Sequence, residues 1–339
     1  MLNPLLDRYD IVLLDMDGVI TSEEVYWNAA ALSVYELLHS KNYYGKESLD
    51  PAALMEKLPE IRADIFTEDK TIKVLKNKGV NNNWDLAWIV LTGAKHLDTT
   101  DFSLVYSWAQ ELPDVENGMF AFVSEILEKL GFSKEDAMHH SGLWDKIQFA
   151  FQEWFLGSEQ IEKYWHAPAI QPGKPGLSFS EKPLVNQEKL LRLFSEIAET
   201  KRLGIGTGRP RVEAETPLIS WKAMPYMTRD SIVTYDELEA LAKKNPGTSY
   251  AKPHPYMFLR GVFGYDHPTE DLMAGRYDKS RCAKTLVIGD AACDLFAAKN
   301  AGCDFAAVLT GVQGEAARGF FEENNADYIL RDILELLQS

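Results

Sequence analysis

Two aspartates one residue apart, Asp15 and Asp17, follow directly on the apolar run Ile11–Leu14 and precede Gly18. A short run of branched apolar residues bounded by a turn signal is typical of a strand buried in a parallel sheet. Ligands of open α/β sheets bind beyond the carboxyl ends of the strands, where these two side chains would lie. A carboxylate there can act as a nucleophile or as a general acid and base. The segment is therefore the first candidate for a reactive centre.

Further polar residues stand at the ends of later predicted strands or at the start of the helices that follow them. They are Thr207, Gly208, Lys252, Asp290 and Asp294. A single doubly wound sheet would bring all of these ends to one edge. The combined set of carboxylates, a hydroxyl and an ammonium suits phosphoryl transfer through an aspartyl phosphate.

This chemistry assigns a task to each kind of group. Because neighbouring carboxylates repel one another, the site needs a hard divalent cation, and Mg²⁺ typically binds one or two carboxylates together with substrate oxygens. Thr207, Lys252 and the backbone N–H groups near Met16, Asp17 and Gly208 can hold the phosphoryl oxygens. Asp17 is placed to protonate the leaving oxygen and then to activate water.

Four motifs in this order resemble those of the haloacid dehalogenase superfamily, in its phosphatase branch with an inserted helical cap. They read Asp15-Met-Asp-Gly-Val, Thr207-Gly-Arg, Lys252-Pro-x-Pro and Gly289-Asp-x-x-x-Asp294. The resemblance covers about residues 8–20 and 180–339, with a core like that of phosphoglycolate phosphatases. The cap resembles no particular member and is larger than that group usually carries.

The resemblance implies a role for each matched residue. It implies Asp15 as nucleophile and Asp17 as general acid and base, with Thr207 and Lys252 stabilising the phosphoryl charge. Met16 and Gly208 are expected to contribute to phosphate binding. The expected magnesium ligands are Asp15, Asp17, Asp290 and Asp294, the last of which would assist either the metal or Lys252.

The pattern of helices and strands predicts two domains, which the length of 339 residues also favours. Residues 1–20 and 180–339 alternate strands with helices, which predicts an α/β doubly wound parallel sheet. Residues 21–179 show helical spacing and hold seven of the eight tryptophans, which predicts an inserted α-helical cap domain. Within that insert, the Pro- and Gly-rich stretch 167–177 is the best candidate for a linker. The connection 265–281 is longer than the family usually has, and its role stays open.

Composition excludes several classes of protein. The formal net charge of −16 and the lack of a basic cluster argue against a nucleic-acid partner. Three scattered cysteines argue against a disulfide framework or a zinc site and favour a reducing cytoplasm. No signal peptide and no membrane-spanning run is recognised, so we expect a cytoplasmic protein with a small phosphorylated substrate. The oligomeric state is left open.

Three functional readings remain at this point. The first is a magnesium-dependent phosphatase acting on a small metabolite, and the second is a phosphomutase of the β-phosphoglucomutase type, which shares every core motif. The third is a non-catalytic relative that binds a ligand. Asp17 disfavours a haloalkanoate dehalogenase, since those enzymes lack the second acid.

A few residues invite a functional reading that the sequence does not decide or does not support. Arg209 is as compatible with a solvated surface position as with a phosphate contact. Cys293 is expected to be a small turn residue and not a nucleophile. His139 and His140 are not expected to form a metal pair, because adjacent residues of a helix do not face one another.

Overall fold

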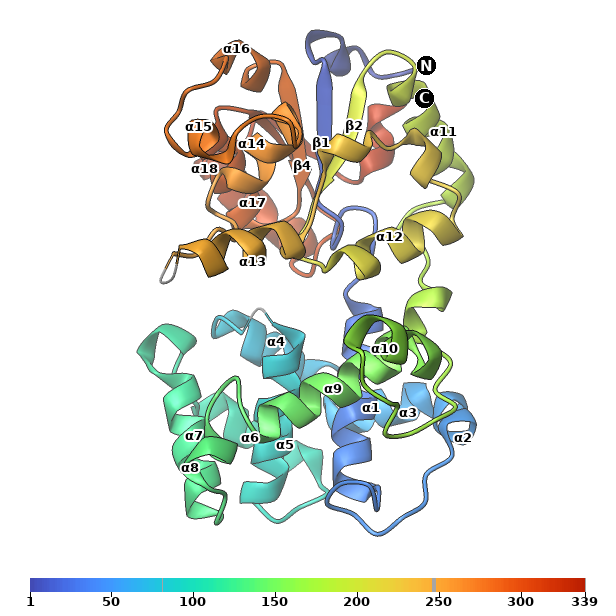
Figure 1. Cartoon of the computed structure of the whole chain (residues 1–339), viewed down its shortest axis with the longest axis vertical. Helices are drawn as coiled ribbons and strands as arrows, with labels where there is room; N and C mark the ends of the chain where they lie inside the picture. Colours follow the sequence, from blue (N-terminus) through green and yellow to red (C-terminus); the bar gives the residue numbers. More distant parts are fainter. Residues whose placement is uncertain (81, 246–247, 339) are drawn as a thin grey trace. The chain divides into compact units, whose positions relative to one another are not determined.

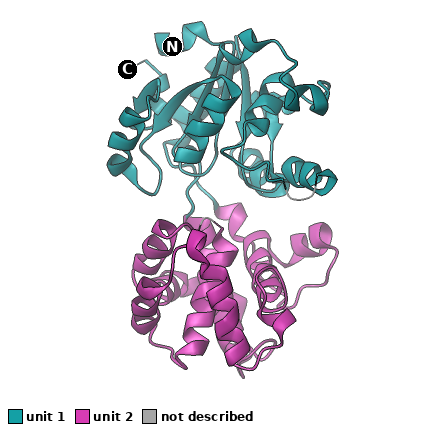
Figure 2. Ribbon diagram, turned by 90° about the vertical axis from the view of Figure 1, so that its left-hand side faces the viewer, with its two compact units in different colours: residues 1–23, 181–339 teal, residues 24–180 magenta. Residues whose placement is uncertain are grey.

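A computed structural model describes residues 1–80, 82–245 and 248–338 of the chain. The chain divides into two compact units, Met1–Glu23 with Glu181–Ser339, and Glu24–Ser180 (Figure 2). The sequence analysis placed these boundaries after residue 20 and before residue 180. Each unit has its own buried core, so each is described by itself.

The first unit is built on a six-stranded sheet in which every neighbouring pair of strands is parallel (Figure 1). The strands are β1 (Ile11–Leu14), β2 (Arg202–Gly206), β3 (Ile232–Val233), β4 (Thr285–Gly289), β5 (Asp304–Val308) and β6 (Tyr328–Leu330). Their order across the sheet is β3-β2-β1-β4-β5-β6. The predicted α/β class and parallel sheet are confirmed, although β3 is shorter than the expected 231–235.

Helices cover both faces of this sheet, as a doubly wound fold requires. Successive side chains of a strand point to opposite faces, and accordingly Val12 and Leu14 join one apolar cluster while Ile11 and Leu13 join another. The first cluster includes residues from α11 (Gln187–Ala198), α12 (Arg211–Ser220) and the 3₁₀ segments Pro4–Arg8 and Ile333–Leu336. The second includes residues from α13 (Tyr235–Lys244), α14 (Tyr256–Phe263), α17 (Ala292–Ala301) and α18 (Arg318–Glu323).

Some helix boundaries differ from those expected. The helix expected over 216–224 is α12, which begins at Arg211 because Pro210 opens it and accepts the first hydrogen bonds from Glu213 and Ala214. Pro217 lies inside α12, where a proline is usually a boundary signal. The connection 265–281 contains two short helices, α15 (Thr269–Met273) and α16 (Lys279–Cys282).

All the regular secondary structure among the described residues of the second unit is helical, apart from one isolated bridge between Ser40 and Glu47. Its central helix α1 (Glu24–His39) packs against α3 (Leu58–Ile65), α5 (Asn83–His96) and α9 (Leu143–Leu156). The other helices are α2 (Pro51–Glu56), α4 (Lys70–Asn77), α6 (Phe102–Glu111), α7 (Met119–Lys129), α8 (Lys134–Ala137) and α10 (Ser158–Trp165). Across the described parts of both units, no helix is long and apolar enough to cross a membrane.

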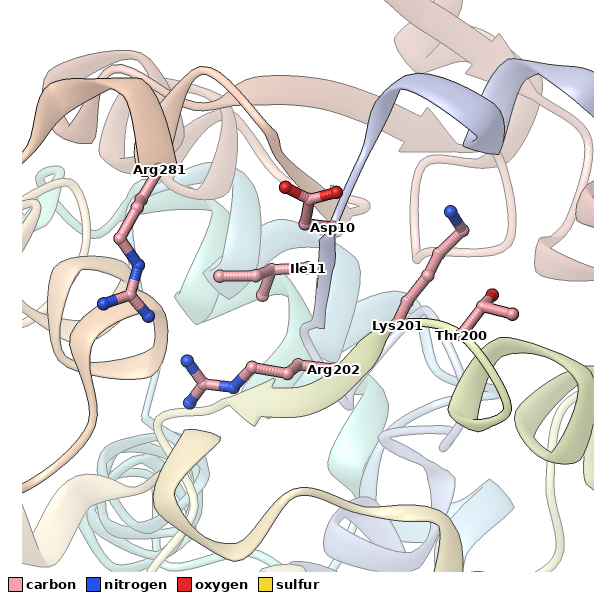
Figure 3. Close-up of a pocket in the computed structure, with 6 residues that line it drawn as sticks. All are labelled: Asp10, Ile11, Thr200, Lys201, Arg202 and Arg281. Carbon is pink, nitrogen blue, oxygen red and sulfur yellow. The ribbon is translucent and has the colours of Figure 1, made fainter.

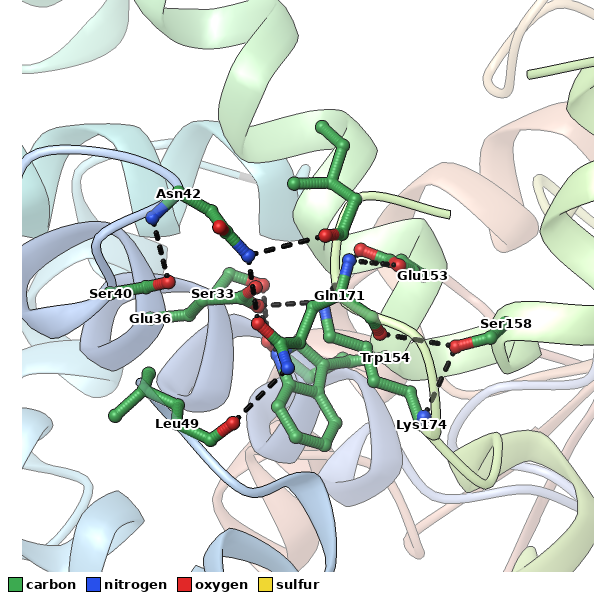
Figure 4. Close-up of polar contacts among 12 residues, drawn as sticks. Ser33, Glu36, Ser40, Asn42, Leu49, Glu153, Trp154, Ser158, Gln171 and Lys174 are labelled. Carbon is green, nitrogen blue, oxygen red and sulfur yellow. Dashed lines mark hydrogen bonds and ion pairs between the residues drawn. The ribbon is translucent and has the colours of Figure 1, made fainter. Parts of the chain in front are cut away.

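The Pro- and Gly-rich segment 167–177 is anchored to the helical unit and is not a free linker (Figure 4). The buried ammonium of Lys174 lies 2.6 Å from Glu36 Oε2 on α1 and 2.7 Å from Glu153 Oε2 on α9. The backbone N–H of Gln171 donates to Glu153 Oε1 at 2.8 Å. One buried cation therefore joins the returning chain to two core helices.

Replacing Lys174 with methionine is expected to lower the free energy of unfolding by about 3–5 kcal/mol, because two buried carboxylates then lose their counter-ion. The measurement is urea denaturation of the whole chain at neutral pH. Lys129→Met, which removes an exposed lysine of α7, is the matched control and should change stability by less than about 0.5 kcal/mol. Equal effects of the two substitutions would contradict the anchoring role of Lys174.

Candidate active site

The carboxyl ends of the central strands bring four of the predicted site residues together. Asp15 follows β1, Asp290 follows β4, Asp294 lies in the first turn of α17, and Lys252 precedes α14. The ammonium of Lys252 lies 2.7 Å from Asp15 Oδ1 and 2.7 Å from Asp294 Oδ1. Oxygens of Asp15, Asp290 and Asp294 lie within 4.8 Å of one another.

Negative charge exceeds positive charge in this cluster, and the proton affinities reflect the excess. Burial raises the pKa of Asp15 to about 7, although Lys252 lowers it. Burial, followed by the charges of Asp294 and Asp15, raises the pKa of Asp290 well above its usual range. Burial lowers the pKa of Lys252, but the two carboxylates beside it raise the pKa more, so the ammonium stays charged.

The donor set of this cluster fits a magnesium ion. Three carboxylates supply only oxygen, which is the ligand that Mg²⁺ prefers. Two glycines enclose Asp290, since a Cβ atom at Gly18 or Gly311 would lie 2.2 Å or 1.9 Å from Asp290 Oδ2. Gly18 also has a φ of +76°, which few other residues adopt. The backbone therefore closes around this carboxylate and leaves no room for side chains at either position.

Asp17 is not one of the three clustered carboxylates, in contrast to its expected place among the metal ligands. Its carboxylate accepts hydrogen bonds from Arg209, from Nε to Oδ2 at 3.0 Å and from Nη2 to Oδ1 at 2.5 Å. The hydroxyl of Thr21 donates to Asp17 Oδ1 at 3.0 Å. The structure thus separates the two aspartates of the first motif, with Asp15 facing a lysine and Asp17 held by an arginine.

Arg209 is itself held on its other side by Glu181, a residue that the sequence analysis did not single out. Nη1 and Nη2 of Arg209 donate to the two carboxylate oxygens of Glu181 at 3.0 and 2.8 Å. Arg209 is only 3% exposed, which excludes the solvated surface position that the sequence left open. Burial raises the pKa of Glu181, and Arg209 opposes that shift. No motif marks Glu181, which lies 28 residues before Arg209 and just after the helical unit.

Unpaired backbone donors lie beside these side chains. Among the described residues, the N–H groups of Met16, Asp17 and Gly208 have no hydrogen-bond acceptor, although Met16 is fully buried. Buried N–H groups are rarely left without a partner. Thr207, also buried, ends the neighbouring strand, and its hydroxyl accepts from the N–H of Arg209 at 3.2 Å. The residues predicted to bind phosphate therefore carry backbone N–H groups that pair with no described residue.

Two other features of this unit lie outside that chemistry. Burial, ahead of the nearby carboxylates, raises the pKa of Cys293 to about 12, so its thiol is a poor nucleophile.

A cavity of about 310 Å³ opens at the amino ends of β1 and β2, the opposite edge of the sheet (Figure 3). Its lining residues are Asp10, Ile11, Thr200, Lys201, Arg202 and Arg281.

Comparisons with known proteins give one family match and likenesses to solved structures. A family model for HAD-hydrolase-like proteins matches residues 249–336, which include Lys252, Asp290 and Asp294. A crystal structure from the Northeast Structural Genomics Consortium is 26% identical, with a TM-score of 0.84 over 97% of each chain. The phosphatase Tt82 from Thermococcus thioreducens is 18% identical, with a TM-score of 0.50 over 97% of this chain and 95% of its own, a likeness of fold. No curated protein sequence matches the chain.

The family match and the geometry concern different motifs of the candidate site. The match contains the third and fourth motifs, while the sheet brings the first motif, with Asp15, to the lysine and carboxylates of the other two. The second motif follows β2, the strand beside β1. The match thus places residues 249–336 with HAD-hydrolase-like proteins, and the parallel sheet brings the remaining motifs beside that region.

Proposed function

We propose that the protein is a magnesium-dependent phosphatase that hydrolyses a small phosphorylated metabolite through an aspartyl phosphate on Asp15. The observation that carries this proposal is the pairing of Asp15 with Lys252 beside two further carboxylates, next to unpaired backbone N–H groups. A nucleophile, a cation and oxyanion donors are the three parts that phosphoryl transfer to a carboxylate requires.

The side chains divide the reaction into two steps. In the first, a carboxylate oxygen of Asp15 attacks phosphorus and the bond to the leaving oxygen breaks, while Asp17 gives that oxygen a proton. In the second, Asp17 takes a proton from water, which attacks the phosphorus of the aspartyl phosphate and releases inorganic phosphate. Lys252, Thr207 and the N–H groups near Met16 hold the phosphoryl oxygens. Magnesium, when bound by Asp15, Asp290 and Asp294, supplies positive charge to the transferring group.

A panel of sugar, nucleotide and organic-acid phosphates, assayed for free phosphate with and without Mg²⁺, tests the proposal. We expect Mg²⁺-dependent release from at least one phosphate ester. A product that keeps its phosphate, formed only with a bisphosphate activator, would instead indicate a phosphomutase. No turnover of any ester and no acylphosphate analogue trapped at Asp15 would indicate a protein that only binds its ligand.

Magnesium is expected to bind more tightly as the pH rises between about 5.5 and 7.5. The metal-free protein holds protons on Asp290 and Asp15, whose pKa values are raised, and the metal must displace them. Each displaced proton increases the affinity by up to about tenfold per pH unit. Calorimetric titration in two buffers with different ionisation heats measures both the affinity and the protons released.

The control for this titration is Asp290→Asn, which should weaken binding and reduce the pH dependence. An affinity for Mg²⁺ that stays constant across this range in the unmodified protein would show that the site carboxylates are already ionised. That result would contradict the raised pKa values of Asp15 and Asp290. Weaker binding in Asp290→Asn would still test whether Asp290 is a ligand.

A further inference from the structure

Asp85, His139 and His140 form a second cluster of potential metal ligands, wholly within the helical unit. One ligand atom from each residue lies within 4.8 Å of the other two. Among the described residues, this cluster and the three carboxylates of the candidate active site are the two groups with this property. The two clusters differ in chemistry, because one offers oxygen alone and the other offers two imidazoles and one carboxylate.

The turn between α8 and α9 allows the two adjacent histidines to face one another. The sequence pattern of residues 134–142 predicts a helix, but α8 ends at Ala137, so both histidines lie in the following turn. His140 has a φ of +62°, in the left-handed region that few residues other than glycine adopt. The two ring centroids are 3.9 Å apart. Because His139 and His140 lie outside a helix, the rule that adjacent helical side chains do not face one another does not apply to them.

A buried carboxylate completes the cluster. Asp85, in the first turn of α5, is 6% exposed, and its Oδ1 lies 2.7 Å from His139 Nε2. The indole N–H of Trp144 donates to the same oxygen at 2.7 Å and so fixes the orientation of the carboxylate. Phe120 stacks on the His139 ring, with centroids 4.0 Å apart. The second carboxylate oxygen of Asp85 has no hydrogen-bond partner among the described residues.

We propose that Asp85, His139 and His140 bind a borderline divalent transition metal, with Zn²⁺ as the best fit. Zinc sites with three protein ligands commonly combine histidine with a carboxylate and keep one position open. The metal would replace the proton shared by His139 and Asp85, and the indole of Trp144 would support Asp85 from outside the ligand set. His140 is exposed, which leaves solvent access for a water ligand. Imidazole disfavours Mg²⁺, so the two clusters select different ions.

Zinc titration of the chelator-treated whole chain, in saturating Mg²⁺ to occupy the carboxylate cluster, tests this site by calorimetry. We expect one high-affinity zinc per chain. His140→Asn should weaken zinc binding at least about tenfold, because it removes one imidazole while asparagine tolerates the left-handed backbone. His166→Asn is the matched control, since His166 is also exposed in this unit and has a φ of +52°. It should leave the zinc affinity unchanged.

Asp85→Asn provides the second test, because it removes the carboxylate charge and nearly preserves the side-chain shape. It should also weaken zinc binding at least about tenfold. Absence of high-affinity zinc in the unmodified chain, or equal affinity in His140→Asn and His166→Asn, would overturn the proposal. The cluster would then be an ordinary His139–Asp85 hydrogen bond. Since the readout is zinc binding, neither outcome depends on phosphatase activity.

Discussion

Asp15→Asn is expected to reduce turnover of p-nitrophenyl phosphate by at least about a thousandfold, the scale of loss when a covalent nucleophile is removed. An amide is a very weak nucleophile toward phosphorus, and it cannot form the aspartyl phosphate. The change is nearly isosteric and removes one negative charge from a cluster in which burial and neighbouring carboxylates already raise the pKa values. The fold should therefore survive, and Lys252 keeps Asp294 as a partner at 2.7 Å.

The matched control is Asp10→Asn, which changes an exposed aspartate immediately before the same strand. Among the described residues, the carboxylate of Asp10 pairs only with Lys284, at 3.2 Å on the surface, so activity should stay within about twofold of the unmodified protein. Activity and thermal unfolding are measured on both variants. Folded Asp15→Asn protein with full magnesium-dependent turnover would rule out Asp15 as the nucleophile. If Asp15→Asn loses both activity and folding, the role of Asp15 is decided by trapping an acylphosphate analogue on the unmodified protein.

The sheet and the positions of Asp15 and Asp290 at its edge could be predicted because both depend on local sequence. Ile11–Leu14 and Thr285–Gly289 are continuous apolar runs, and the polar residue after each run marks a strand end. Parallel pairing then brings Asp15 and Asp290 to one edge without further information. The meeting of Asp15 with Lys252 follows from the same topology, since α14 packs against β1, β2 and β3.

What could not be predicted depends on contacts between distant segments or on a single backbone torsion. Glu181 meets Arg209 across 28 residues, and no spacing rule connects a residue just after the helical unit to the second motif. His139 and His140 face one another because α8 ends at Ala137 and the backbone of His140 adopts the left-handed conformation. In both cases the residue types were visible in the sequence, but the geometry that gives them a partner was not.

Arg209→Met is expected to lower kcat about a hundredfold and to let the phosphoenzyme accumulate. Arg209 binds both oxygens of Asp17 and so fixes the orientation of the carboxylate that takes a proton from water in the second step. Without the guanidinium, the carboxylate of Asp17 loses its fixed orientation. Loss of a positioned general base costs about 10²–10⁴-fold in rate. Rapid-quench measurement of acylphosphate during turnover, compared between Arg209→Met and the unmodified protein, tests this expectation.

A stability effect accompanies this substitution, and a second variant separates it from the catalytic one. Arg209→Met leaves the buried Glu181 without its counter-ion, at a cost of about 3–5 kcal/mol in unfolding free energy. Adding Glu181→Gln removes the uncompensated charge, so the double variant should recover most of the stability. Turnover should not recover, because Asp17 still lacks Arg209. If stability and kcat return together, Arg209 acts only by supporting the fold; if stability alone returns, it positions Asp17.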